Sequence, residues 1–153
     1  CDMRNIMLAR GMTDVELATD NCVVLKGTLA DPYTGKLIEF VRGNKTSSLV
    51  QIDHVVALSD AWQKGAQDLD ADTRLQLAND PLELLAVDGP ANQKKGDGDA
   101  ATWLPPNKAF RCQYVARQIA VKSKYRLWVT EAEKSAMKRV LSGCGEQVLP
   151  LLS

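Results

Sequence analysis

Short apolar runs separated by turn residues occupy the first half of the chain, whereas the last third carries apolar residues at helical spacing. The pattern predicts a short helix over residues 3–10, ended by Gly11, and then strands over residues 22–30 and 36–42. The segment 31–35 between the strands contains a proline and a glycine, which supply the backbone geometry of a turn. We therefore predict an amino-terminal β-hairpin.

The middle of the chain alternates between strand-like and helix-like segments. The second helix-like stretch is followed by an apolar run, a turn and a proline, and proline suits the first turn of a helix because its missing N–H has no helical partner there. The predicted elements are a strand at 49–53, helices at 59–66 and 70–78, a strand at 82–87, and a helix from Pro90 through Lys95. This order predicts an α+β fold class for residues 1–153, in a single domain.

Two helices are predicted near the carboxy terminus, over residues 106–123 and 131–142, because each has one apolar face. Cys112 lies on the apolar face of the first helix, near its start, and Cys144 follows the end of the second. If the two helices pack antiparallel, these two cysteines come together. A disulfide is therefore predicted to join the helices into a hairpin.

The same pairing leaves Cys1 with Cys22, and no Cys-x-x-Cys pair indicates a zinc site or a redox motif. Two disulfides indicate an oxidising compartment, so the protein is predicted to be secreted or located in the cell envelope. The chain begins without a basic-then-apolar leader, so any secretion signal is expected to have been removed or to lie outside this sequence. Four reduced cysteines in a cytosolic protein are the open alternative.

Charge is distributed unevenly although the net charge is zero. Residues 1–90 hold 8 Lys/Arg and 14 Asp/Glu, whereas residues 91–126 hold 8 basic residues and 2 acidic ones. A basic segment favours a polyanionic partner such as nucleic acid, although solvated helix faces also carry such charges. No run approaches the roughly 20 apolar residues of a membrane span, so we expect no membrane partner. We also expect a monomer.

The dipeptide Asp53-His54 carries the main chemical signal, because His54 is the sole histidine of the chain. It lies at the end of a predicted strand, where a carboxylate beside an imidazole places a metal ligand next to a general base. The plainer interpretation is a surface or hydrogen-bonded histidine. Asn92 and Lys95 form a second polar group, one helical turn apart, on the helix that follows the second strand.

Three segments together resemble HNH nucleases of the ββα-metal group. They are Ile52–Leu58 (IDHVVAL), Leu82–Val87 (LELLAV) and Asn92–Asp97 (NQKKGD). The longer stretch from Asp53 through Asn107 is similar to the GmrSD-type HNH family, particularly its secreted bacterial members. The resemblance covers nearly the whole chain, and it implies a ββα-metal core between the amino-terminal hairpin and a disulfide-stapled helical hairpin.

The resemblance also implies a function, namely metal-dependent endonuclease activity on DNA, with RNA as a further candidate substrate and with little sequence specificity. His54 would be the general base, because imidazole exchanges protons near neutral pH. Asp53 and Asn92 would bind one divalent cation, Mg²⁺ or Mn²⁺, through hard oxygen atoms. Lys95, facing the same way as Asn92, would contact a phosphate; its alternative is a solvated helix residue.

One position departs from the pattern of the family. Relatives usually have asparagine in the second strand, where this chain has Glu83. The extra carboxylate is expected to raise metal affinity, to keep His54 more basic or to weaken the site; alternatively Glu83 is a surface residue. A weakened site defines the second functional hypothesis, a non-catalytic module that binds nucleic acid or an envelope partner. A phosphoesterase for small substrates is the third.

The remaining conspicuous side chains receive structural interpretations. Trp62, Trp103 and Trp128 are predicted to lie in the core or at its edge. Asp97 and Asp99 are interpreted as part of a helix exit, with assistance to a metal as the alternative.

Overall fold

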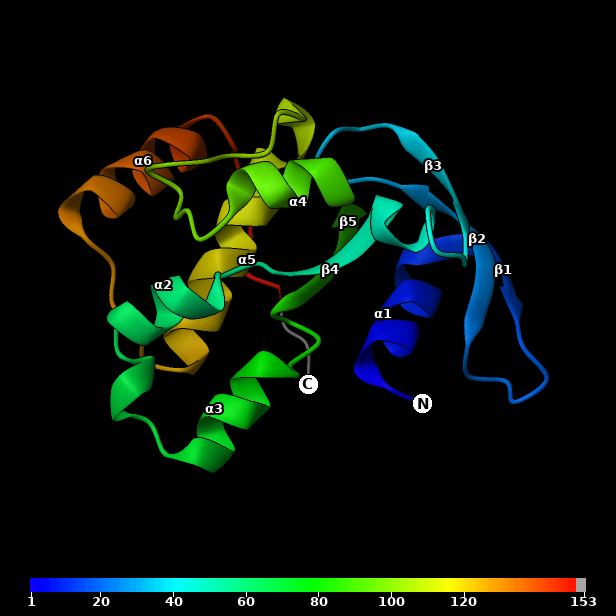
Figure 1. Cartoon of the computed structure of the whole chain (residues 1–153). Coiled ribbons are helices and arrows are strands. Elements are labelled where there is room, and N and C mark those ends of the chain that lie inside the picture. The colour runs from blue at the N-terminus through cyan, green and yellow to red at the C-terminus, as the bar shows by residue number, and fades with distance from the viewer. Residues whose placement is uncertain (151–153) are drawn as a thin grey trace.

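The computed structural model describes residues 1–150, in which short helices surround two small antiparallel sheets (Figure 1). The chain opens with α1 (Met3–Gly11), and Asp2 caps this helix by accepting the N–H of Asn5. The first sheet follows, in the order β1-β2-β3. Its strands are β1 (Met12–Leu17), β2 (Val24–Ala30) and β3 (Leu37–Val41).

The second sheet pairs β4 (Val50–His54) with β5 (Leu84–Asp88). α2 (Leu58–Gln63) and α3 (Ala71–Ala78) lie between the two strands in sequence, and α4 (Gly89–Lys95) begins directly after β5. The elements β4, β5 and α4 therefore form a ββα unit. Short 3₁₀ turns at Ser47–Leu49 and Ala66–Asp68 complete this part of the chain.

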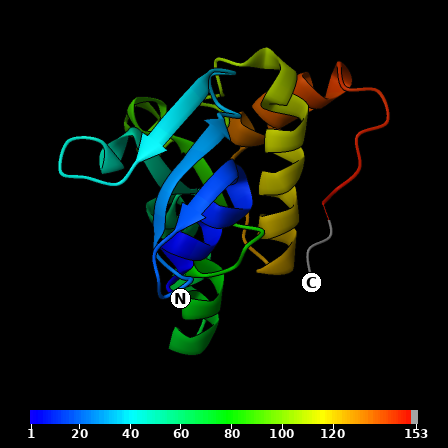
Figure 2. The ribbon, with the colours of Figure 1, turned by 90° about the vertical axis from the view of Figure 1, so that its right-hand side faces the viewer.

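Two helices close the fold, namely α5 (Arg111–Lys124) and α6 (Glu131–Ser142), after a 3₁₀ turn at Lys108–Phe110. Figure 2 shows the three-stranded sheet on one side of the molecule and α5 on the other. Three groups of buried apolar side chains connect these layers: one joins α1 and the first sheet to β4 and β5, one joins the ββα unit to α5 and α6, and one joins α2 and α3 to α5.

Local chemistry fixes the position of α4 against the second sheet. Asp88 caps the helix, because its Oδ2 accepts the N–H of Ala91 at 2.8 Å. Gly89 is required at the first position, because a Cβ there would lie 2.1 Å from the carbonyl oxygen of Ser48. The close approach of Ser48 and Gly89 places α4 beside the end of the sheet.

The structure confirms most of the predicted elements and corrects others. The predicted hairpin is β2 and β3, but β1 was not predicted and extends it to three strands. The predicted helix over 59–66 ends at Gln63, and the one over 106–123 begins at Arg111 after a 3₁₀ turn. The tryptophan prediction is wrong for Trp62 and Trp128, which are 48% and 51% exposed.

Both predicted disulfides are present, Cys1–Cys22 and Cys112–Cys144. The second joins the start of α5 to Cys144, two residues beyond the end of α6, as the antiparallel packing of these helices required. Within residues 1–150, no helix is long and apolar enough to cross a bilayer.

Reduction of the disulfides should lower the melting temperature substantially. The bridges join residues 21 and 32 positions apart, and chain-entropy estimates give about 3–4 kcal/mol for each. We expect Cys112→Ser/Cys144→Ser to lower the melting temperature more than Cys1→Ser/Cys22→Ser, because the Cys112–Cys144 disulfide closes the longer loop and holds two core helices. Thermal unfolding of both variants, with and without reductant, measures this; equal melting temperatures for the parent and both variants would contradict it.

Candidate active site

A polar pocket of about 340 Å³ lies where the end of β4 meets α2 and α4. Asp53, His54 and Asn92 all line it, so the structure brings together three of the predicted site residues. The other lining residues are Ile52, Ala57, Leu58, Ser59, Gln93, Gly96 and Asp97. β4 pairs with β5 so that Asp53 lies opposite Leu85. Asp53 and His54 therefore both lie at the end of the sheet.

The carboxylate of Asp53 is held by two buried donors. Its Oδ2 accepts the hydroxyl of Tyr33 and the ammonium of Lys95, the latter at 2.5 Å. Burial of the Tyr33 hydroxyl is the main reason that its pKa lies well above the ordinary value, and electrostatic repulsion from Tyr114 and Asp53 adds to this effect. The hydroxyl therefore keeps its proton and donates. Asp53 lines the pocket, and its other carboxylate oxygen, Oδ1, accepts no hydrogen bond from residues 1–150.

The imidazole of His54 is oriented by α3. Its Nε2 lies 2.9 Å from the carbonyl oxygen of Ala78, near the end of that helix. A carbonyl oxygen can only accept, so Nε2 carries the proton in the neutral ring and Nδ1 has the lone pair. This assignment leaves Nδ1 as the basic atom of His54.

Asn92 is oriented by Gln51 of β4. The Nδ2 of Asn92 donates to Oε1 of Gln51 at 2.9 Å, and Nε2 of Gln93 donates to the same oxygen at 3.0 Å. The amide nitrogen is used in this way, and Oδ1 of Asn92 accepts no hydrogen bond from residues 1–150, so it is available as a metal ligand. Asp53 and Asn92 thus each present one oxygen that could hold a hard cation.

Lys95 does not line the pocket, contrary to the expectation that it faces the same way as Asn92. Its side chain is fully buried, and the ammonium also donates to the carbonyl oxygens of His54 at 2.7 Å and Val55 at 3.0 Å. A lysine in this position neutralises Asp53 and holds the end of β4, so we assign it no contact with phosphate.

Glu83 is fully buried, so the interpretation as a surface residue is wrong. It precedes β5, and its Oε1 accepts the N–H of Val56 at 2.6 Å, while its backbone carbonyl accepts the N–H of Val55 at 2.7 Å. Oε2 has no hydrogen-bond partner within residues 1–150. Burial raises the pKa of Glu83 well above its ordinary value, which favours the neutral acid. Glu83 therefore braces the chain that follows His54.

Replacement of Glu83 by glutamine should make stability less sensitive to pH. The folded-state pKa is raised, so the contribution of the protonated acid is complete below the ordinary value of 4.5 and is lost as the pH rises through the folded-state pKa. The loss reaches at most about 1.4 kcal/mol per pH unit for one proton. From pH 5 to 8, the stability of the parent should fall relative to that of Glu83→Gln.

Urea unfolding of the two proteins across this pH range measures the difference. Glu16→Gln, which changes an exposed carboxylate on β1, is the matched control and should track the parent. Parallel pH profiles for the parent and Glu83→Gln would contradict the assignment of a buried, neutral acid.

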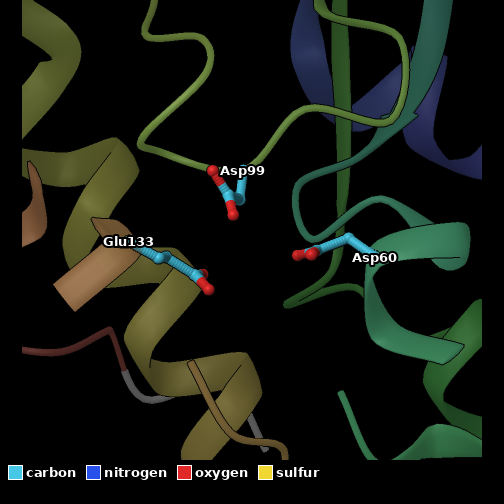
Figure 3. Close-up of side chains that lie close together, drawn as sticks. All are labelled: Asp60, Asp99 and Glu133. Atoms are coloured by element: carbon cyan, nitrogen blue, oxygen red, sulfur yellow. The ribbon is translucent and has the colours of Figure 1, made fainter. Parts of the chain in front are cut away.

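Three further carboxylates converge away from this pocket, from α2, from the segment after α4 and from α6 (Figure 3). They are Asp60, Asp99 and Glu133, and their oxygens lie within 4.8 Å of one another. The ammonium of Lys64 lies among them, 2.5 Å from Asp60, 2.8 Å from Asp99 and 2.7 Å from Glu133. Lys122 pairs with Asp60 and Glu133 as well. The two lysines offset two of the three negative charges and occupy the space between the carboxylates, so the cluster is a structural ion network that ties α2 to α6.

The sequence was then compared with known proteins. Residues 3–140 match the family of GmrSD restriction endonucleases, C-terminal domain. The chain belongs to this family. Membership indicates a nuclease-related role, with nucleic acid as the class of substrate and a divalent metal as a suitable cofactor.

A relative from the fungus Arthroderma benhamiae is named "Uncharacterized secreted protein". It is 38% identical over 146 residues, which cover 94% of this chain and 68% of the relative. The two disulfides fit an extracellular protein as well. The relative is fungal, so the expected bacterial branch gains no support from it. No solved structure matches the chain.

Sequence reasoning missed Tyr33 and Gln51, which hold Asp53 and Asn92. Gln51 carried a usable signal, because it lies two residues before Asp53 on the same strand and is a polar residue in an apolar run. Tyr33 carried none, because it lies in the turn between β2 and β3, 20 positions away from Asp53.

Proposed function

We propose that this protein is a secreted, metal-dependent HNH-type endonuclease that hydrolyses phosphodiester bonds of DNA, with RNA as a second substrate, and with little sequence specificity. The observation that supports this most is the convergence of Asp53, His54 and Asn92 on one polar pocket at the end of a ββα unit. The membership of the chain in an endonuclease family supports the same class of reaction.

The oxygen atoms available as ligands suit a hard divalent cation. Oδ1 of Asp53 and Oδ1 of Asn92 are left free by the bonds that their neighbouring atoms make to Lys95 and Gln51. Carboxylate and amide oxygens suit Mg²⁺ or Mn²⁺, and two protein ligands leave coordination positions for water and phosphate oxygens. Bound there, the cation would supply Lewis-acid stabilisation of negative charge on the phosphate and the leaving oxygen.

His54 performs the proton transfer in this proposal. Its Nδ1 accepts a proton from the attacking water while the new bond to phosphorus forms and the bond to the 3′ oxygen breaks. The leaving oxygen takes a proton from solvent. The carbonyl of Ala78, which accepts the Nε2–H, keeps the ring in place and stabilises the imidazolium that forms.

Lys95 and Tyr33 contribute by positioning Asp53. Both donate to Oδ2, so the carboxylate offers the pocket one oxygen in a fixed direction. Lys95 also balances the charge of Asp53 when no cation is bound. Glu83 contributes indirectly, because it holds the backbone of Val56.

The proposal is tested by digestion of supercoiled plasmid with EDTA, and then with Mg²⁺ or Mn²⁺ added back in excess. We expect nicking and linearisation with either metal and none in EDTA. Cleavage that persists in EDTA would contradict a metal-dependent mechanism, and binding of plasmid without cleavage under any metal would favour the non-catalytic module. Hydrolysis of mononucleotide esters but not of plasmid would favour a small-substrate phosphoesterase.

A further inference from the structure

A second pocket, of about 560 Å³, is lined in part by the segment that follows α4 and has no role in the mechanism above. The segment that follows α4 lines both pockets: Gly96 and Asp97 belong to the first, and residues 100–104 to the second. The first turn of α5 and the last two turns of α6 form the opposite wall. Figure 1 shows this segment passing beside α6 on its way from α4 to α5.

The charged residues that line the second pocket are all basic. They are Lys108, Arg111 and Arg139, and none of them forms an ion pair within residues 1–150. Lys108 and Arg139 are exposed. Arg111 is half-buried, and its Nε donates to the carbonyl oxygen of Pro105 at 2.7 Å, which leaves the rest of the guanidinium free. The pocket therefore concentrates positive charge without a protein anion to balance it.

A disulfide and an aromatic contact hold the backbone that carries these cations. The disulfide between Cys112 and Cys144 ties the residue after Arg111 to the end of the helix that carries Arg139. Trp103 forms part of the pocket wall, and its ring packs edge-on against Tyr33 at 5.0 Å between centroids. The disulfide and the aromatic contact hold the backbone around the cations, which lowers the cost of ordering the site when an anion binds.

We propose that this basic pocket binds the phosphodiester backbone of the nucleic acid substrate beside the bond that His54 attacks. The inference rests on the proposed function and names a second contact region for the same substrate. One strand that leaves the first pocket over residues 96–104 meets Lys108, Arg111 and Arg139 next. Several cations along one wall suit the repeated phosphates of a strand, whereas a single small anion needs fewer.

Equilibrium binding of a fluorescein-labelled DNA duplex of about 20 base pairs tests the proposal, in EDTA so that cleavage plays no part. Lys108→Glu/Arg139→Glu should weaken binding about tenfold or more at low salt, because phosphates then face carboxylates. The neutral variant Lys108→Ala/Arg139→Ala should lower the slope of log affinity against log salt by about 2, one for each lost phosphate contact.

Lys26→Glu/Arg126→Glu is the matched control, because it makes the same change in total charge on β2 and in the segment that follows the far end of α5. It should bind the duplex as the parent does. Equal weakening by the two charge-reversed variants, no weakening by either, or no binding of the duplex by the parent would overturn the proposal.

Hydrolysis of bis(p-nitrophenyl) phosphate separates this inference from the proposed function, because such a small diester occupies only the His54 pocket. The basic-pocket variants should hydrolyse it at the parental rate with Mg²⁺ or Mn²⁺. If the parent hydrolyses it and the duplex result fails, the second site alone is wrong. If the parent never hydrolyses it but the basic-pocket variants bind DNA more weakly, the catalytic assignment alone is wrong.

Discussion

His54→Ala should lower the rate of plasmid cleavage about 10²–10⁴-fold, which is the usual cost of losing a general base. The side chain is half-buried and, within residues 1–150, makes one hydrogen bond, to the carbonyl of Ala78, so the fold should survive. Added imidazole should restore part of the activity, because it can occupy the space that the ring leaves and accept the same proton. Initial rates with saturating Mn²⁺, beside circular dichroism spectra, measure both effects.

Gln93→Ala is the matched control for this experiment. Gln93 also lines the pocket and is exposed, but an amide has no proton-accepting role at neutral pH. We expect it to cleave plasmid at nearly the parental rate. A folded His54→Ala protein with parental activity would remove His54 from the mechanism.

Asp53→Ala and Asn92→Ala should both weaken binding of Mg²⁺ and Mn²⁺ and sharply reduce cleavage, because each removes one oxygen ligand. Only Asp53→Ala should also destabilise the fold. It leaves the fully buried ammonium of Lys95 without its partner, and breaking a buried pair in this way costs about 3–5 kcal/mol. Isothermal titration calorimetry and thermal unfolding measure the two effects separately.

The double variant Asp53→Ala/Lys95→Met separates the two roles of Asp53. It removes both buried charges, so it should recover most of the lost stability while staying unable to cleave plasmid. Unchanged metal affinity in both single variants would exclude this pair as the metal site. Cleavage by the double variant would show that Asp53 acts only through Lys95.

Much of the fold could be predicted because its signals are local. The strands β4 and β5 are short apolar runs bounded by turn residues, and α4 follows a turn with Pro90 in its first positions. The Cys112–Cys144 disulfide followed from the packing of two amphipathic helices, and Cys1–Cys22 was the pairing that remained. β1 was missed because its sequence, MTDVEL, alternates poorly, and its pairing with β2 contains register irregularities.

The candidate site was predictable in part for the same reason. Asp53, His54 and Asn92 carry recognisable residue types at the ends of recognisable elements. Lys95 was placed wrongly because helical spacing puts it one turn from Asn92 but does not show that a buried carboxylate draws its ammonium inward. Glu83 is buried in a segment that α5 holds from far along the chain, because Arg117 of α5 donates to the carbonyl oxygens of Leu82 and Leu84 on either side of it. Local sequence carries no signal for that contact.

The location of a bound metal tests the central claim most directly. Crystals of the protein soaked in Mn²⁺ and measured at an anomalous wavelength would show where the ion binds. We predict one anomalous peak in the pocket of His54, in contact with Oδ1 of Asp53 and Oδ1 of Asn92. A peak among Asp60, Asp99 and Glu133, with the first pocket empty at saturating Mn²⁺, would contradict it.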